Sequence, residues 1–125
     1  MIKSEFEKSD VNLCNLKYLT DIMGGKKNLI KGIMDAFLLQ MPEELVKINA
    51  AVENVDYPVI KNLAHTMKSS VSIMDIAIII PVLQELETLA SGNKSIERIR
   101  VLNTELNTIC NQAIIEIEKQ KHNYE

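Results

Sequence analysis

A histidine and a lysine three residues apart carry the clearest chemistry in this sequence. On a helix, His65 and Lys68 extend from the same face, and that face is not the apolar one. A neutral, exposed imidazole has a lone pair able to attack an electrophile. An ammonium beside it can neutralise the oxygens of a phosphoryl group on the ring. Lys61, Ser69 and Ser72 share this side, so the spacing predicts a histidine that accepts a phosphoryl group and leaves room for a partner.

Other chemistry is scarce in the chain. The sequence has no GxGxxG, GxxxxGK[ST], HExxH or GxSxG pattern, so we expect neither an ATP site nor a catalytic nucleophile elbow. His122 is the only other histidine and lies in a polar C-terminal stretch, so no metal site is expected. Paired carboxylates occur only where we expect solvated helix faces, at Glu43, Glu44, Glu85 and Glu87.

Composition and charge limit the possible partners. A chain of 125 residues with 46% hydrophobic residues is expected to form one domain. The net charge of −3 argues against nucleic acid, which requires a basic face. Cys14 and Cys110 lack metal or redox spacing and are expected to be small buried residues. The charged N-terminus and the short apolar run from Ile76 to Leu83 predict no signal peptide, no membrane span and a cytoplasmic location.

Apolar spacing predicts five helices. Residues 1–12 read as a flexible lead-in, and a short helix capped by Asn15 ends at Gly24-Gly25. A long helix follows from Lys26 to about Glu53, which Pro42 should kink or divide. Asp56 should cap the helix that carries His65 and runs to about Met74, along which six apolar residues share one stripe: Ile60, Leu63, Ala64, Met67, Val71 and Met74.

The second half of the chain is also expected to be helical. We expect a non-helical joint from Asp75 to Ala77 and a helix from about Ile78 to Ala90. Ser95 should cap a last helix, whose apolar stripe fades near Lys119. Short connections force helices to run antiparallel. The predicted fold is therefore all-α, an up-down four-helix bundle over residues 13–118 with a short additional N-terminal helix, followed by a polar tail at 119–125.

The segment Ala64-His65-Thr66-Met67-Lys68-Ser69-Ser70 resembles the signature of histidine-containing phosphotransfer (HPt) domains of bacterial phosphorelays. That signature has an alanine, the active histidine, two residues, a lysine, a glycine, and then serine or alanine. By this resemblance His65 is the phosphoacceptor and Lys68 assists the phosphoryl group. The likeness extends more loosely from Leu16 to about Ile117, and it departs from the family where Ser69 and Asp75 occupy usual glycine positions.

The resemblance implies a phosphorelay intermediate without kinase activity or an ATP site of its own. Its partners would be response-regulator receiver domains, with that of a hybrid histidine kinase as one option, and the Mg²⁺ would belong to the receiver. Contacts to the partner are expected from Lys61, Ser69 and Ser72. We expect a monomer that itself holds no cofactor.

Two alternatives remain from the sequence. His65 can be a surface histidine without a task, in a helical adaptor that binds a signalling partner without phosphotransfer. It can also be a general base, which requires a pocket that holds both His65 and a carboxylate.

Overall fold

The computed structural model describes Cys14 and residues 16–124, and within these residues the fold is a bundle of four long helices. They are α3 (Lys27–Glu53), α4 (Tyr57–Ile73), α5 (Ile80–Ser91) and α6 (Ile96–Lys121). Short α2 (Leu16–Ile22) precedes them, and two 3₁₀ turns, Ala77–Ile79 and His122–Tyr124, precede α5 and follow α6. The prediction of an all-α, up-down four-helix bundle with a short N-terminal helix is confirmed.

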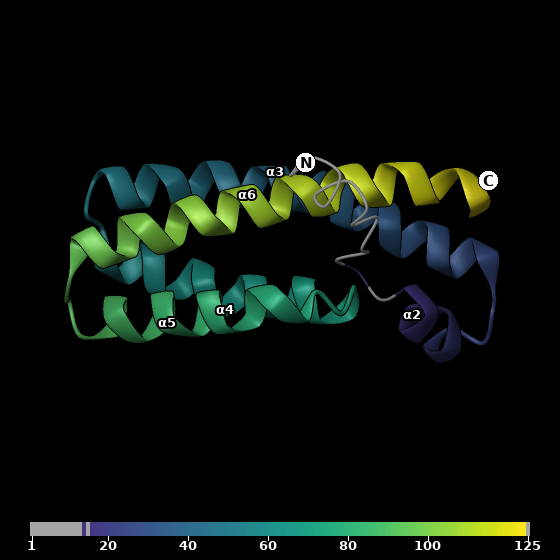
Figure 1. The fold of residues 1–125 in the computed structure, drawn as a ribbon, viewed down its shortest axis with the longest axis horizontal. Helices are drawn as coiled ribbons and strands as arrows, with labels where there is room; N and C mark the ends of the chain where they lie inside the picture. Colours follow the sequence, from purple (N-terminus) through teal and green to yellow (C-terminus); the bar gives the residue numbers. More distant parts are fainter. Residues whose placement is uncertain (1–13, 15, 125) are drawn as a thin grey trace, which may run out of the picture.

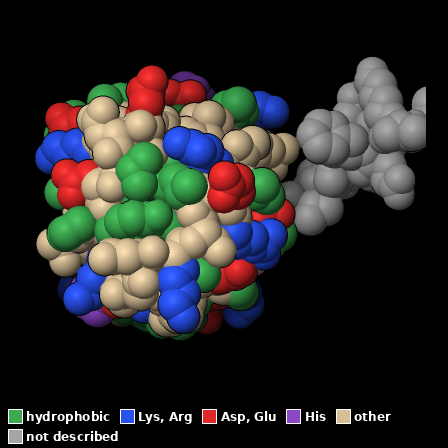
Figure 2. All heavy atoms as spheres, turned by 90° about the vertical axis from the view of Figure 1, so that its left-hand side faces the viewer, with side chains coloured by type: hydrophobic (Ala, Val, Ile, Leu, Met, Phe, Trp, Pro, Cys, Tyr) green, Lys and Arg blue, Asp and Glu red, His purple; other side chains and the backbone are tan. Residues whose placement is uncertain are grey.

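The bundle has two layers of two helices. α3 and α6 form one layer and α4 and α5 the other, and α3 also packs on α4, and α5 on α6 (Figure 1). α2 lies at the end where α4 passes into α5 (Figure 1). At the opposite end, acidic, basic and hydrophobic side chains are interspersed (Figure 2). Among the described residues, no helix is both long and apolar enough to cross a membrane.

The core follows from the spacing of apolar residues three and four apart, which places them along one side of each helix. In the described residues every fully buried side chain is hydrophobic. α3 contributes the largest set to this core: Ile30, Met34, Phe37, Met41, Leu45, Ile48, Ala51 and Val52. The opposite side of each helix faces solvent, so the core fixes which residues are exposed.

Both cysteines lie in this core, as the sequence predicts. Cys14 and Cys110 are buried and unpaired. Burial raises the pKa of the Cys110 thiol to about 12, with a smaller contribution from the charge of Glu44. Such a thiol stays protonated at neutral pH and is a poor nucleophile. The backbone N–H of Cys14 donates to the Glu116 carboxylate at 3.3 Å, which ties the start of the described chain to α6.

Two expectations, a division of α3 at Pro42 and a capping role for Ser95, differ from the structure. α3 is continuous through Pro42, so the predicted division there is wrong, although α3 bends along its length in Figure 1. Pro42 is exposed, and water can solvate the carbonyl that loses its intrahelical donor. Ser95 stands at the N-cap of α6, but its side chain makes no capping hydrogen bond, so that expectation is wrong. Its left-handed backbone, with φ of 48°, differs from the extended conformation of capping serines.

The joint between α4 and α5 begins one residue earlier than expected. Met74, Asp75 and Ile76 lie between the end of α4 and a 3₁₀ turn that begins at Ala77. Asp75 takes the left-handed conformation, with φ of 51°, that a glycine would adopt more easily. The N–H of Ile76 donates to the carbonyl of Val71 at 3.1 Å, which closes the end of α4. The chain therefore turns at Asp75 without the glycine that the resembled family usually has at this position.

At the C-terminus, α6 runs to Lys121 and crosses the boundary expected between residues 118 and 119. The division of the chain into lead-in, bundle and tail stays a prediction. The expectations for residues 1–12 and for Asn15 lie outside the described residues.

Candidate functional site

α4 holds the predicted reactive pair on its solvent side. The Asp56 carboxylate accepts a hydrogen bond from the N–H of Val59 at 3.4 Å and marks the start of this helix, as predicted. Four residues anchor its inner face in the core: Ile60, Ala64, Met67 and Val71. The side chain of His65 is 70% exposed, so the imidazole is available to a partner. Lys68, one turn further, is only 23% exposed because it extends towards α5.

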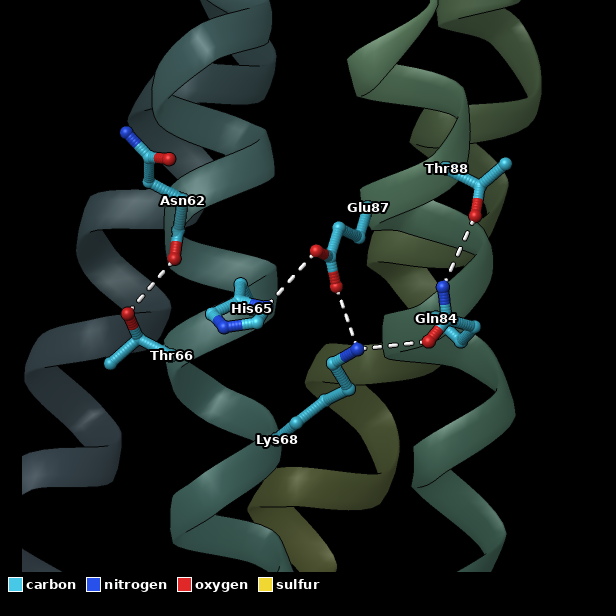
Figure 3. A network of polar contacts seen from close by, with 7 residues as sticks. All are labelled: Asn62, His65, Thr66, Lys68, Gln84, Glu87 and Thr88. Atoms are coloured by element: carbon cyan, nitrogen blue, oxygen red, sulfur yellow. Dashed lines mark hydrogen bonds and ion pairs between the residues drawn. The ribbon is translucent and has the colours of Figure 1, made fainter.

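α5 supplies the groups that meet this pair (Figure 3). His65 Nδ1 lies 3.0 Å from Oε2 of Glu87, and Lys68 Nζ lies 2.7 Å from the other oxygen of the same carboxylate. Lys68 also donates to Gln84 Oε1 at 2.8 Å. Gln84 in turn donates through Nε2 to Thr88 Oγ1 at 3.2 Å. A single carboxylate from α5 therefore joins the histidine and the lysine of α4.

Glu87 is ionised in this arrangement. The ion pair with Lys68 holds the pKa of the Glu87 carboxyl below its usual range, and the contact with His65 adds to this effect. Burial opposes both and is the second-largest influence on the pKa, since the Glu87 side chain is 18% exposed. The carboxylate is thus a fixed negative charge beside the imidazole.

This charge determines which nitrogen of His65 is free. An ionised carboxylate accepts hydrogen bonds and cannot donate them, so in a neutral ring the nitrogen that faces Glu87 carries the hydrogen. The hydrogen position follows from the contact of Nδ1 with Glu87 at 3.0 Å. The lone pair then belongs to Nε2, on the side of the ring away from Glu87. The arrangement therefore presents one defined nucleophilic atom to solvent.

The neighbouring glutamate serves a different helix. Glu85 receives a two-pronged contact from Arg98 of α6, from Nε at 2.9 Å and from Nη2 at 3.0 Å. Residues two apart on a helix point about 200° apart. Glu85 therefore faces α6 while Glu87 faces α4, and the two do not form an acid and base pair.

The remaining predicted residues surround the pair without entering its network. Lys61 and Ser69 are exposed on α4. Ser72 lies beside a hollow of about 470 Å³ between α2 and the joint of α4 with α5. Among the described residues His65 is not part of this hollow, so the enclosed site that a general base requires is not formed there.

Sequence reasoning missed Glu87 and Gln84 as parts of the site. Their spacing of three residues places both on one face of α5, which is a usable signal. It does not show that this face turns towards Lys68, because that depends on how α4 and α5 are rotated against each other. In the described part of the chain, no group of three His, Cys, Asp or Glu side chains could hold a metal ion.

Comparison with known proteins places this geometry in a family. The family model described as "Hpt domain" matches residues 32–114, and this range includes the whole network around His65. Because the match spans most of the chain, the protein belongs to the Hpt domain family. Membership supports a role in a phosphotransfer relay.

A solved structure shares the fold. It is the crystal structure of histidine-containing phosphotransfer protein B (HptB) from Pseudomonas aeruginosa PAO1, with a TM-score of 0.81 and 20% sequence identity. The match covers 90% of this chain and 96% of that one. No curated protein sequence matches the chain.

Proposed function

We propose that this protein carries a phosphoryl group on His65, which it accepts from an aspartyl phosphate of one receiver domain and passes to another. The observation that carries the proposal is the exposed ring of His65, whose Nδ1 faces Glu87 at 3.0 Å. A ring held in this way directs its free nitrogen outwards, where only a partner can reach it. Membership of the Hpt family supports the same chemistry.

The transfer step is a substitution at phosphorus. The lone pair of His65 Nε2 attacks, a nitrogen to phosphorus bond forms, and the bond from phosphorus to the aspartyl oxygen breaks. The electron pair of that bond returns to the carboxylate of the receiver. The attack leaves positive charge on the ring, and the Glu87 carboxylate against Nδ1 stabilises it. The same steps in reverse deliver the group to a second receiver.

Lys68 provides the positive charge for the phosphoryl oxygens. Its ammonium is held between Glu87 and Gln84, at 2.7 Å and 2.8 Å, on the face that His65 shares. Rotation about its flexible side chain brings the ammonium to non-bridging oxygens on the ring. The negative charge of an arriving phosphoryl group competes with Glu87 for this lysine.

The receiver supplies the rest of the reaction. We assign the Mg²⁺ to its aspartate site, because Glu87 already serves His65 and Lys68. Lys61, Ser69 and Ser72 are proposed to contact the receiver. The protein acts as a monomer and takes the group from a partner, without a kinase reaction of its own.

Incubation with a phosphorylated receiver tests the proposal. The wild-type protein should acquire an acid-labile, base-stable label, and the His65→Gln protein should acquire none. Equal labelling of the variant would overturn the assignment of His65. A wild-type protein that binds the receiver but never accepts the label would instead be an adaptor.

A further inference from the structure

The hollow beside Ser72 lies near the C-terminal end of α4, on the face that carries His65, where α2 lies beside the joint of α4 with α5. It has a volume of about 470 Å³ and opens to solvent. Six side chains form most of its walls: Tyr18, Ser72, Asp75, Ala77, Ile80 and Pro81. Four helical elements, α2, α4, the 3₁₀ turn and α5, thus meet around one depression, and none of them fills it.

The chemistry of the hollow selects what can enter. Ala77 and Pro81 are exposed and Ile80 is half-buried, so a large part of the lining is apolar. Among the described residues that line the hollow, Asp75 is the only charged one, and none is a lysine or an arginine. An apolar side chain accompanied by a hydrogen-bond donor fits this lining. An acidic side chain does not, since Asp75 would repel it.

The hollow lies close enough to His65 for one partner to cover both. Ser72 follows His65 by seven residues, two helical turns, so the two share a face of α4 about 10 Å apart along the axis. A stable protein contact covers about 800 Å² on each partner, and a circular patch of that area has a radius of about 16 Å. A partner centred on His65 therefore reaches the hollow.

The surface around His65 differs in its exposed apolar side chains between the two directions along α4. Towards the start of the helix, Lys61 and Asn62 present polar surface, and the exposed apolar side chains there are the smaller Val55 and Val59, 38% and 39% exposed. Towards the hollow, Ile73 and Ile78 are 48% and 55% exposed, and Tyr18 on the wall is 44% exposed. Large exposed hydrophobic side chains beside a depression are typical of a contact surface. The larger and more exposed apolar side chains of the footprint thus lie on the hollow side.

We propose that this hollow is the anchoring point for the receiver domain that exchanges its phosphoryl group with His65. It takes an apolar side chain of the receiver, and Asp75 accepts a hydrogen bond from the same partner. The inference rests on the proposed function and extends it from the reacting atoms to the contact that holds the partner.

Ala77→Glu tests the hollow without touching His65. The added carboxylate places a charge in the apolar depression and next to Asp75. With a receiver that labels the wild-type protein, we expect the rate of transfer to fall at least tenfold. Labelling by a small phosphoramidate, which needs no docking, should keep its wild-type rate and shows that the variant is folded. Ala77→Gln, which fills the hollow without charge, should lower receiver transfer less.

Ala50→Glu is the matched control, because Ala50 is exposed on α3, away from the hollow. Its transfer rate should equal that of the wild type. If the Ala77→Glu protein accepted phosphoryl at the wild-type rate, or if the rate fell equally in the Ala50→Glu protein, the anchoring role would be overturned. The proposed function would remain intact. Failure of the wild-type protein to accept phosphoryl from either donor would overturn the proposed function and the anchoring role with it.

Discussion

Two polar seams join neighbouring helices on opposite layers of the bundle, and they differ in charge. Between α3 and α6, Asn49 accepts hydrogen bonds from the side chains of Asn103 and Asn107, both at 2.8 Å. Between α4 and α5, Glu87 joins His65 and Lys68. The asparagine seam has no group that titrates near neutral pH or attacks an electrophile. It can only hold two helices in register, whereas the charged seam also directs a nucleophile outwards.

The difference indicates how one bundle separates stability from chemistry. Amides satisfy each other with partial charges, so the asparagine seam is the same before and after a partner binds. In the charged seam one carboxylate, that of Glu87, contacts both the imidazole of His65 and the ammonium of Lys68. A new negative charge on His65 would compete with Glu87 for Lys68. Substitutions in the charged seam should therefore change transfer, while those in the asparagine seam should change stability.

Removal of the lysine should have the largest effect. Lys68→Ala deletes the charge that we propose faces the phosphoryl oxygens, and we expect transfer to slow by about 100-fold. Quenched-flow labelling with a phosphorylated receiver measures the rate, and circular dichroism should show an unchanged helical signal. Lys61→Ala is the comparison, because it removes the same charge one turn from His65, at a residue proposed to contact the receiver but outside the network, and it should slow transfer less. Equal slowing in both variants would indicate general attraction of the partner and no specific role for Lys68.

Neutralisation of the Glu87 carboxylate should have the next largest effect on the transfer rate. Glu87→Gln keeps the size of the side chain but can donate as well as accept, so the imidazole is no longer restricted to one tautomer. We expect transfer to slow by about tenfold, within the usual range for an oriented acid or base. Glu85→Gln breaks only the contact with Arg98 and should transfer normally. Normal transfer by Glu87→Gln would show that Glu87 merely joins two helices.

The asparagine seam should respond in stability alone. Asn49→Ala removes the acceptor of two hydrogen bonds and the donor of one to Asn107. Because the seam is exposed and water can replace part of these contacts, the free energy of unfolding should fall by about 1 kcal/mol. Urea denaturation measures this loss, and the transfer rate should be unchanged. A slower transfer would mean that the two layers of the bundle are coupled.

The smallest expected effect is a difference between the two seams in how stability depends on pH in the acid range. The pKa of Glu87 is lowered from an ordinary value of 4.5, mainly by Lys68, so ionisation of this carboxyl stabilises the fold. This contribution is complete above the ordinary pKa and is lost as pH falls through the lowered one. The stability difference between wild type and Glu87→Gln should shrink over that interval. The deficit of Asn49→Ala should stay constant there, and an equal change in both would remove the distinction.

The sequence predicts the bundle because apolar residues recur along one side of each helix, as from Ile60 to Val71 in α4. It also predicts that His65 faces solvent, since that residue falls outside the stripe. Contacts between helices are beyond such reasoning: Glu85 and Glu87 look alike in the sequence but face different helices. Caps are also difficult, because Asp56 and Ser95 are both good capping residues and only Asp56 has a backbone conformation that allows it.

We expect Glu87 to direct His65 to react through Nε2. NMR of the ¹⁵N-labelled protein, phosphorylated by a receiver, tests this directly by identifying the ring nitrogen that is bonded to phosphorus. We predict phosphorus on Nε2 of His65, with hydrogen on Nδ1. Phosphorus on Nδ1 would show that Glu87 does not direct the reaction, and phosphorus on a residue other than His65 would show that His65 is not the acceptor.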